Sequence, residues 1–317
     1  MKKNRYSLGI DIGGTYIKSA ICREDGETVF FMEHETPNTT PSKFLNLVGY
    51  IGELTIKESA VPGFEVIGVG VGFPGTVNHG SGFVDRAPNI KGWKRSNVRL
   101  PLEKWFSKPV VLNNDANLAL LAEKMWGVAK DVNFAVELTL GTGVGGGVLI
   151  GGNLYYGADG YAAELGHVVI DINGPRCSCG KYGCLEVFSG AQGFVNEAKE
   201  VRKKDFGSLL WSIDNGDITP LSIQKAAESS DKMALLSLKN SSRYLAYGIS
   251  SFIDIFNPEM IILGGGLSRF DELLLKPLVQ ELKRIKPISP IPKIVSSRFK
   301  EKAGVIGACA SVFMEQT

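Results

Sequence analysis

Residues 164–186 read ELGHVVIDINGPRCSCGKYGCLE, and this stretch concentrates three of the chain's five cysteines and one of its three histidines. Three thiolates and one imidazole suit a tetrahedral zinc ion. The candidate ligands are His167, Cys177, Cys179 and Cys184. Four protein ligands leave no open position for an activated water, so we expect a structural zinc in the loop 167–184. The alternative is a surface loop with reduced thiols, which is the less common outcome for closely spaced Cys and His in a cytosolic chain.

The composition of the chain indicates a globular protein. With 317 residues, two domains are expected. A hydrophobic content of 44% and a charged content of 21% are ordinary, and a net charge of +2 without a long basic block implies no nucleic-acid partner. No apolar run reaches the ~18 residues of a membrane span, and Asp11 interrupts the only candidate leader, so we expect a cytoplasmic protein. We expect Cys22 and Cys309 to be buried as small hydrophobes.

Glycine clusters organise the rest of the chain. They occur at residues 11–15, 68–75, 141–147 and 264–266, and each follows a short apolar run. Strands that end in glycine turns are the simplest interpretation. Helical patterns lie between them, at 42–57, 117–126, 231–256 and 269–284. Alternating strands and helices predict an α/β protein, with residues 205–232 as a helical excursion or surface segment.

Two of the clusters are predicted to be hairpin turns that face phosphate. DIGGT (11–15) lies between two apolar runs, where backbone amides and the Thr15 hydroxyl could hold a phosphate and Asp11 a hydrated Mg²⁺. GTGVGGG (141–147) contains a literal GxGxxG, but a strand-like VLIGGNLYYG follows it. A dinucleotide-binding fingerprint must open a helix, so a second hairpin is the better interpretation. Most Gly-Gly hairpins bind nothing, so these turns alone are weak signals.

A third cluster and an acid complete the set of candidate motifs. NPEMIILGGGLS (257–268) is typical of a strand, a glycine turn and a helix. The three glycines could form a flat surface on which a purine or ribose lies, or they could simply connect the strand to the helix. VVLNNDAN (110–117) places Asp115 between an apolar strand and a helix. Capping the helix needs one Asn or Asp and four polar residues are present, so Asp115 could instead accept the proton of an attacking hydroxyl.

Taken together, the motifs resemble those of the ROK family of repressors and sugar kinases. They follow in the family's order: DIGGT, GFPG with APN, NDAN, GTGVGGG, ELGH, CSCGKYGCLE and LGGG. The resemblance implies an actin-like, ribonuclease H-like ATPase fold, with two α/β domains around a cleft. The smaller domain would span 1–114 plus 303–317, with a final helix at 303–314, and the larger would span 115–302.

The same resemblance assigns roles to individual residues. It implies ATP binding by Asp11, Gly13, Gly14, Thr15, Gly141, Thr142, Gly143, Gly145, Gly146, Gly264, Gly265 and Gly266. It implies sugar contacts by Gly75, Asn89, Asn114, Asp115, Glu164, His167 and Glu186, with Asp115 as the catalytic base. Zinc would order the loop between the two glutamates, which could then accept hydrogen bonds from sugar hydroxyls; the alternative is that these carboxylates are merely solvated.

The function expected from this reading is ATP- and Mg²⁺-dependent phosphorylation of a hexose, with glucose first. N-acetylmannosamine or N-acetylglucosamine comes second and fructose third. A sugar-responsive repressor is disfavoured because the phosphate motif begins at Asp11, which leaves no room for an N-terminal helix-turn-helix. A zinc-bearing nucleotide-binding scaffold without catalysis is the remaining alternative. The resemblance also implies a homodimer.

Overall fold

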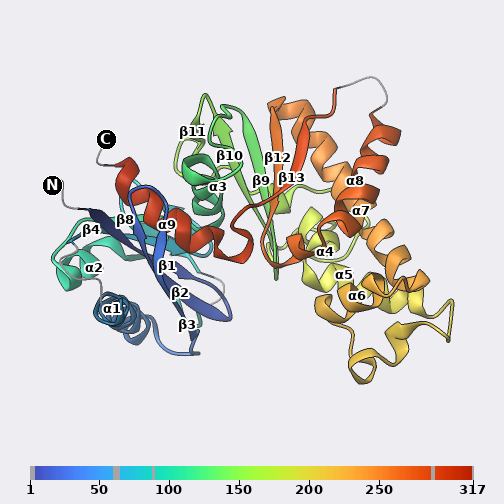
Figure 1. Cartoon of the computed structure of the whole chain (residues 1–317), viewed down its shortest axis with the longest axis horizontal. Helices are drawn as coiled ribbons and strands as arrows, with labels where there is room; N and C mark the ends of the chain where they lie inside the picture. The colour runs from blue at the N-terminus through green and yellow to red at the C-terminus, as the bar shows by residue number, and fades with distance from the viewer. Residues whose placement is uncertain (1–3, 60–64, 88–89, 287–289, 316–317) are drawn as a thin grey trace. The chain divides into compact units, whose positions relative to one another are not determined.

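A computed structural model describes residues 4–59, 65–87, 90–286 and 290–315. The chain divides into two compact units. The first comprises residues 1–132, 147–163 and 301–317, and the second comprises 133–146 and 164–300. Each unit contains strands and helices, which confirms the mixed α/β prediction (Figure 1).

The first unit is built on a five-stranded sheet in the order β3-β2-β1-β4-β8. Its strands are β1 (Arg5–Ile12), β2 (Tyr16–Arg23), β3 (Thr28–Glu35), β4 (Glu65–Phe73) and β8 (Val110–Asn114). The first three strands are antiparallel, whereas β4 and β8 run parallel to β1. Because parallel strands β1 and β8 end at the same edge, the glycine turn after β1 and the acid after β8 are both placed there.

Four helices cover this sheet: α1 (Pro41–Glu58), α2 (Arg99–Phe106), α3 (Asp115–Trp126) and α9 (Ala303–Met314). Two glycines in the sheet let α9 lie close to it, because they carry no side chain. A Cβ on Gly9 would come within 2.4 Å of the Val305 carbonyl oxygen, and one on Gly70 within 1.7 Å of that of Ala308. Cys22 and Cys309 are fully buried, as predicted. A small sheet of β5 (Thr76–Asn78), β6 (Phe83–Arg86) and β7 (Ser96–Asn97) completes the unit.

The other sheet has the order β11-β10-β9-β12-β13. Its strands are β9 (Ala135–Leu140), β10 (Val144–Ile150), β11 (Asn153–Leu154), β12 (Met260–Gly264) and β13 (Lys293–Ser296). The helices of the second unit are α4 (Leu185–Ser189), α5 (Ala191–Arg202), α6 (Pro220–Glu228), α7 (Lys232–Phe256) and α8 (Glu272–Ile285). If the five strands of each sheet are numbered in chain order, both sheets have the order 3-2-1-4-5. The two sheets therefore share one topology, although the sequence shows no fixed-period repeat.

The unit boundaries differ from the expected 1–114 plus 303–317 and 115–302. Helix α3 belongs to the first unit because it packs on α9, where a Cβ on Gly307 would come within 1.7 Å of the Leu118 carbonyl oxygen. Residues 147–163 also group with the first unit, so the division falls within β10. Long-range packing of this kind has no signature in local sequence.

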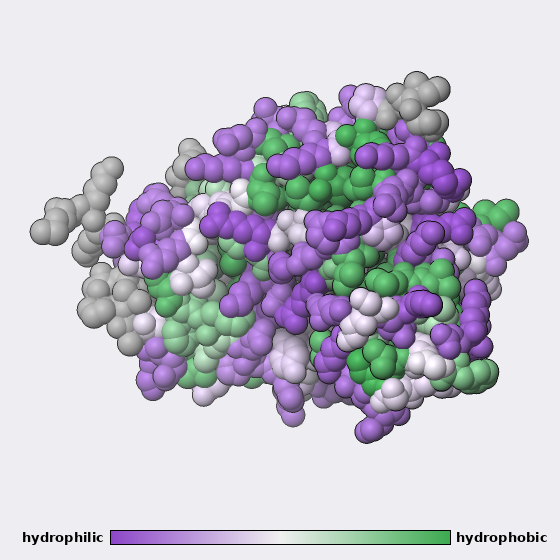
Figure 2. All heavy atoms as spheres, turned by 45° about the vertical axis from the view of Figure 1, so that its right-hand side comes forward, coloured by the Kyte–Doolittle hydropathy of each residue, from purple (hydrophilic) through white to green (hydrophobic). Residues whose placement is uncertain are grey.

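The remaining features are a weakly patterned segment and the surface. Residues 205–232 form two short 3-10 helices, Leu209–Trp211 and Ile213–Gly216, followed by α6, which agrees with the predicted helical excursion. On the face drawn in Figure 2, hydrophobic side chains gather in separate groups between hydrophilic ones. Within the described residues, no helix combines the length and apolarity needed to cross a bilayer.

Candidate functional site

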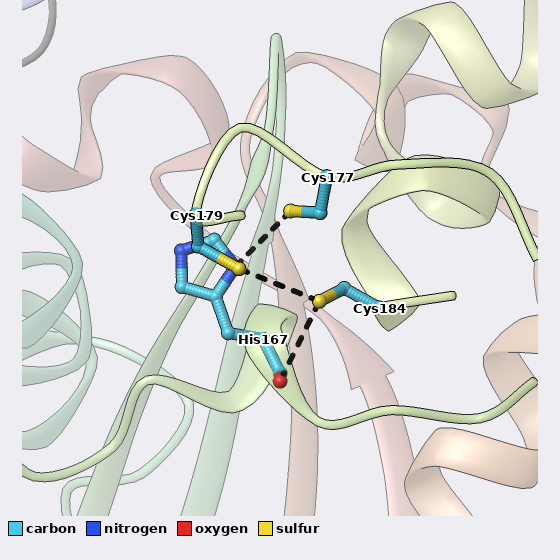
Figure 3. Close-up of side chains that lie close together, drawn as sticks. All are labelled: His167, Cys177, Cys179 and Cys184. Atoms are coloured by element: carbon cyan, nitrogen blue, oxygen red, sulfur yellow. Dashed lines mark hydrogen bonds between the residues drawn. The ribbon is translucent and has the colours of Figure 1, made fainter. Parts of the chain in front are cut away.

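The predicted metal ligands come together in the second unit (Figure 3). Ligand atoms of His167, Cys177, Cys179 and Cys184 all lie within 4.8 Å of one another. The Cys179 and Cys184 sulfurs are 3.6 Å apart, and the Cys177 sulfur is 3.6 Å from His167 Nδ1. Ligands at Zn–S ≈ 2.3 Å form a tetrahedron with edges of about 3.8 Å, so the donor set and its spacing fit zinc.

Two glycines shape the loop that carries the three cysteines. Gly180 (φ +96°) and Gly183 (φ +65°) adopt left-handed conformations that favour glycine. A Cβ on Gly183 would come within 1.5 Å of the Asp171 carbonyl oxygen. Burial and the neighbouring thiols raise the pKa of Cys184 to about 12, because thiolates this close repel one another without a balancing cation. A cation bound among these sulfurs would relieve that repulsion.

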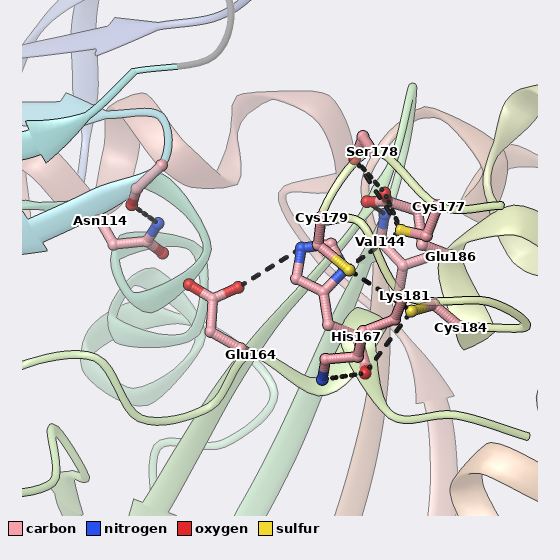
Figure 4. A network of polar contacts seen from close by, with 11 residues as sticks. Asn114, Val144, Glu164, His167, Cys177, Ser178, Cys179, Lys181, Cys184 and Glu186 are labelled. Atoms are coloured by element: carbon pink, nitrogen blue, oxygen red, sulfur yellow. Dashed lines mark hydrogen bonds and ion pairs between the residues drawn. The ribbon is translucent and has the colours of Figure 1, made fainter.

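His167 presents its two ring nitrogens to different groups (Figure 4). Nδ1 faces the Cys177 sulfur, whereas Nε2 lies 4.0 Å from the Glu164 carboxylate. Partial loss of solvation raises the pKa of Glu164, and the negative charge of Glu186 adds to the shift. Ala163, which precedes Glu164, has a φ of +65°, an uncommon conformation for a residue with a Cβ. The strained backbone is thus that of Ala163, directly before Glu164.

Glu186 joins the metal loop to the second glycine turn, a link that the sequence did not predict (Figure 4). One carboxylate oxygen accepts a 3.2 Å hydrogen bond from the Val144 amide, and the other accepts a 3.2 Å bond from the Ser178 hydroxyl. A Cβ on Gly143 would come within 2.3 Å of the same carboxylate. A side chain at position 143 would therefore displace the Glu186 carboxylate from its present place.

The DIGGT segment forms the predicted hairpin turn, between β1 and β2 of the first unit. The Gly13 amide donates to the Tyr16 carbonyl at 2.9 Å, while Gly14 and Thr15 are exposed. Burial raises the pKa of Asp11 to about 6, and the positive charge of Lys18 opposes this shift only in part. A half-buried carboxylate without full compensation is well suited to a cation.

The second and third glycine clusters meet each other in the second unit. Residues 141–143 close a tight hairpin between β9 and β10, with the Gly141 amide donating to the Gly143 carbonyl at 2.9 Å. Thr142, Gly145 and Gly146 belong to the same hairpin. Gly264 ends β12, and Gly265 (φ +77°) passes so close to β9 that a Cβ would come within 2.4 Å of the Leu140 carbonyl oxygen. A 3-10 helix, Gly266–Phe270, follows.

A cavity of about 270 Å³ opens beside these two clusters. Gly141 and Gly266 form part of its wall. The other lining residues come from α5, from α6 and from the 3-10 helix: Ala191, Pro220, Leu221, Gln224, Leu267, Arg269 and Phe270. The lining is mainly apolar, as expected for a planar base. Sequence reasoning missed Pro220, Leu221 and Gln224, because they lie in the segment of weakest pattern and carry no motif.

Asp115 is the first residue of α3 in the first unit, directly after β8. Asn114 caps this helix through its side-chain oxygen, which accepts from the amides of Ala116 and Asn117. The Ala116 amide also donates to Asp115 Oδ1 at 2.9 Å. The Asn114 amide nitrogen donates to the Gly75 carbonyl at 3.1 Å. Both ends of the Asn114 side chain are therefore hydrogen-bonded within the protein. Asn89 lies outside the described residues.

Comparisons with known proteins agree with this set of motifs. The sequence model of the ROK family matches residues 7–314. A glucokinase from Thermotoga maritima is 36% identical over 98% of this chain and 97% of its own length. A xylose repressor from Caldicellulosiruptor bescii is 32% identical over 97% of this chain and 78% of its own length.

A solved structure is similar over the same span. The ROK family glucokinase from Streptomyces griseus, in complex with glucose and AMPPNP, has a TM-score of 0.85 and 31% identity, covering 96% of this chain and 98% of its own. This likeness confirms the actin-like ATPase fold predicted from the sequence.

Proposed function

Because this chain belongs to the ROK family, we propose that it is an ATP-dependent glucokinase, which transfers the γ-phosphoryl group of ATP to the 6-hydroxyl of glucose. The support comes from the glucokinase of Thermotoga maritima at 36% identity and from the Streptomyces griseus glucokinase, whose structure contains glucose and AMPPNP. Both similarities extend over nearly the whole chain. The function rests on the matched family and on the chemistry of the site, since fold alone does not determine activity.

The position of Asp115 carries the proposal. Its carboxylate stands at the carboxyl end of β8, the edge at which open α/β sheets place their chemistry. Asn114 caps α3, and Asp115 follows it as the first residue of the helix. We assign Asp115 as the base that accepts the proton of the glucose 6-hydroxyl as its oxygen attacks the γ-phosphorus.

The nucleotide would be held by the three glycine clusters. Backbone amides of the turns at 13–15 and 141–146 are suited to phosphate oxygens, because exposed amides in tight turns bind anions. The base would enter the cavity beside Gly266. Asp11 would hold Mg²⁺, which neutralises charge on the phosphates when it is bound.

The sugar would be bound by Glu164, His167 and Glu186, with Asn114, Gly75 and Asn89 nearby. Carboxylates accept strong charge-assisted hydrogen bonds from sugar hydroxyls. His167 and the three cysteines would hold zinc, which in a site of four protein ligands supplies cross-linking alone. His167 Nε2 would then carry the proton and donate it to a sugar oxygen. We further propose a cytoplasmic homodimer.

The decisive experiment is a panel of sugars with ATP, in which ADP release is measured. Glucose should be turned over with the highest kcat/KM, ahead of N-acetylmannosamine, N-acetylglucosamine and fructose. Asp115→Asn should lower kcat by about 10²–10⁴-fold while the thermal unfolding midpoint stays unchanged. The similarity to a xylose repressor makes a sugar-responsive regulator the alternative to a kinase, and a regulator would bind sugar without turnover. No turnover with any sugar would reject the kinase.

A further inference from the structure

Gln224, on α6, lines the cavity beside Gly141 and Gly266. Its Nε2 donates to the Glu228 carboxylate at 2.9 Å and to the Arg269 carbonyl oxygen at 3.4 Å. Among the residues that the structure describes, none donates a hydrogen bond to the Gln224 Oε1. The Gln224 Oε1 is therefore an acceptor at the cavity that no described residue occupies.

The hydrogen bonds determine which end of the amide is which. Glu228 and the Arg269 carbonyl offer only acceptors to Gln224, so the nitrogen must face them. Reversing the amide would set its oxygen against a carboxylate and a carbonyl, which repel it. These bonds assign the nitrogen to Glu228 and Arg269 and leave Oε1 as the end available to a ligand.

We propose that Gln224 selects the base of the phosphoryl donor by accepting a hydrogen bond from the 6-amino group of adenine. This inference rests on the proposed kinase function and adds the base selectivity to it. Leu221, Pro220 and Phe270 supply apolar walls for any purine, so they do not distinguish one purine from another. Hypoxanthine and guanine carry a carbonyl oxygen at position 6, which would meet Oε1 as a second acceptor and leave both unpaired.

The test compares ATP with ITP, because the two donors differ only in the 6-substituent of the base and in the hydrogen that hypoxanthine carries on the adjacent N1. At saturating glucose, the wild-type enzyme should show a kcat/KM for ATP at least roughly tenfold above that for ITP. Gln224→Ala should bring the ratio close to one, mainly by weakening ATP. Gln192→Ala is the matched control, since Gln192 lies on α5, bonds to Asn196 at 2.8 Å and does not line the cavity.

Variants at Glu228 test how Gln224 is oriented. Glu228→Ala removes the main acceptor for Nε2, so the amide can turn and donate to the 6-oxo group, and the ATP/ITP ratio should fall. Glu228→Gln keeps an acceptor oxygen and should retain most of the ratio. A ratio unchanged in Gln224→Ala or in Glu228→Ala would overturn the inference even though ATP is turned over. An absence of turnover in the wild type would instead reject the kinase function.

Discussion

The phenol oxygen of Tyr156 accepts a 2.8 Å hydrogen bond from the side-chain amide of Asn113, which is almost completely buried. The Asn113 oxygen in turn accepts a 2.9 Å bond from the amide of Asn114, the residue before Asp115. The ring of Tyr156 stacks on His79, with ring centroids 3.8 Å apart. A side chain distant in sequence therefore fixes the backbone that presents the proposed base.

Replacing this phenol should affect both stability and catalysis. Tyr156→Phe leaves the buried Asn113 amide without its acceptor, which should lower the free energy of unfolding by about 1–3 kcal/mol. We expect kcat to fall while the KM for ATP stays constant, because only the junction before Asp115 is loosened. Urea unfolding and steady-state kinetics measure the two effects. Tyr155→Phe is the matched control, since the neighbouring Tyr155 is exposed; equal losses in both variants would refute the specific role of Tyr156.

Loss of one metal ligand should weaken sugar binding more than nucleotide binding. Cys179→Ser should bring the zinc content well below one per chain and raise the KM for glucose about tenfold or more, because Glu164 and Glu186 flank the loop that the metal orders. The KM for ATP should change little. Zinc analysis and kinetics provide the readouts, with Cys22→Ala as a thiol lost outside the cluster. A Cys179→Ser enzyme with normal zinc content would argue against this ligand set.

Asp11 should make the fold less stable as the pH rises. Its pKa is raised from 3.8 to about 6 by burial, so the folded state binds the proton more tightly than the unfolded state. The stability that the protonated Asp11 carboxyl contributes to the fold is complete below pH 3.8 and is lost as the pH rises through 6. Above that, the carboxylate costs up to about 3 kcal/mol.

Asp11→Asn removes this cost and should be more stable than the wild type at pH 8. The gain should shrink by roughly half at pH 5, where the wild-type carboxyl is mostly protonated in the folded state. Urea unfolding without nucleotide or Mg²⁺ measures both differences. A gain of the same size at the two pH values would contradict the pKa shift. The variant should nevertheless lose phosphoryl transfer, since no carboxylate remains for the cation.

Ala163 offers a test of backbone strain beside the sugar-binding residues. Its φ of +65° disfavours any side chain, so Ala163→Gly should relieve strain. The entropy that glycine gains in the unfolded chain offsets part of this relief, and the net increase in unfolding free energy should be about 1 kcal/mol or less. A decrease in stability would show that the conformation is not strained.

Local patterns predicted the parts of the site that are local in structure. The hairpin at Gly13–Gly14, the cluster of His167 with three cysteines and the helix that begins near Asp115 each follow from residues close together in sequence. The cavity could not be predicted in the same way, because Leu221 and Gln224 reach it from a segment whose composition resembles surface. Hydrogen bonds between distant residues, such as that from Asn113 to Tyr156, depend on tertiary packing that no periodicity encodes.

The close packing of α9 on the first sheet, which Gly9 and Gly70 allow, has a consequence for folding during synthesis. Helix α9 lies over β1 and β4, yet it leaves the ribosome after every other helix and strand described here. The apolar face that it covers must therefore stay exposed while the entire second unit is translated. A nascent chain of this protein should be most vulnerable to aggregation, and most dependent on chaperones, until its last helix has emerged.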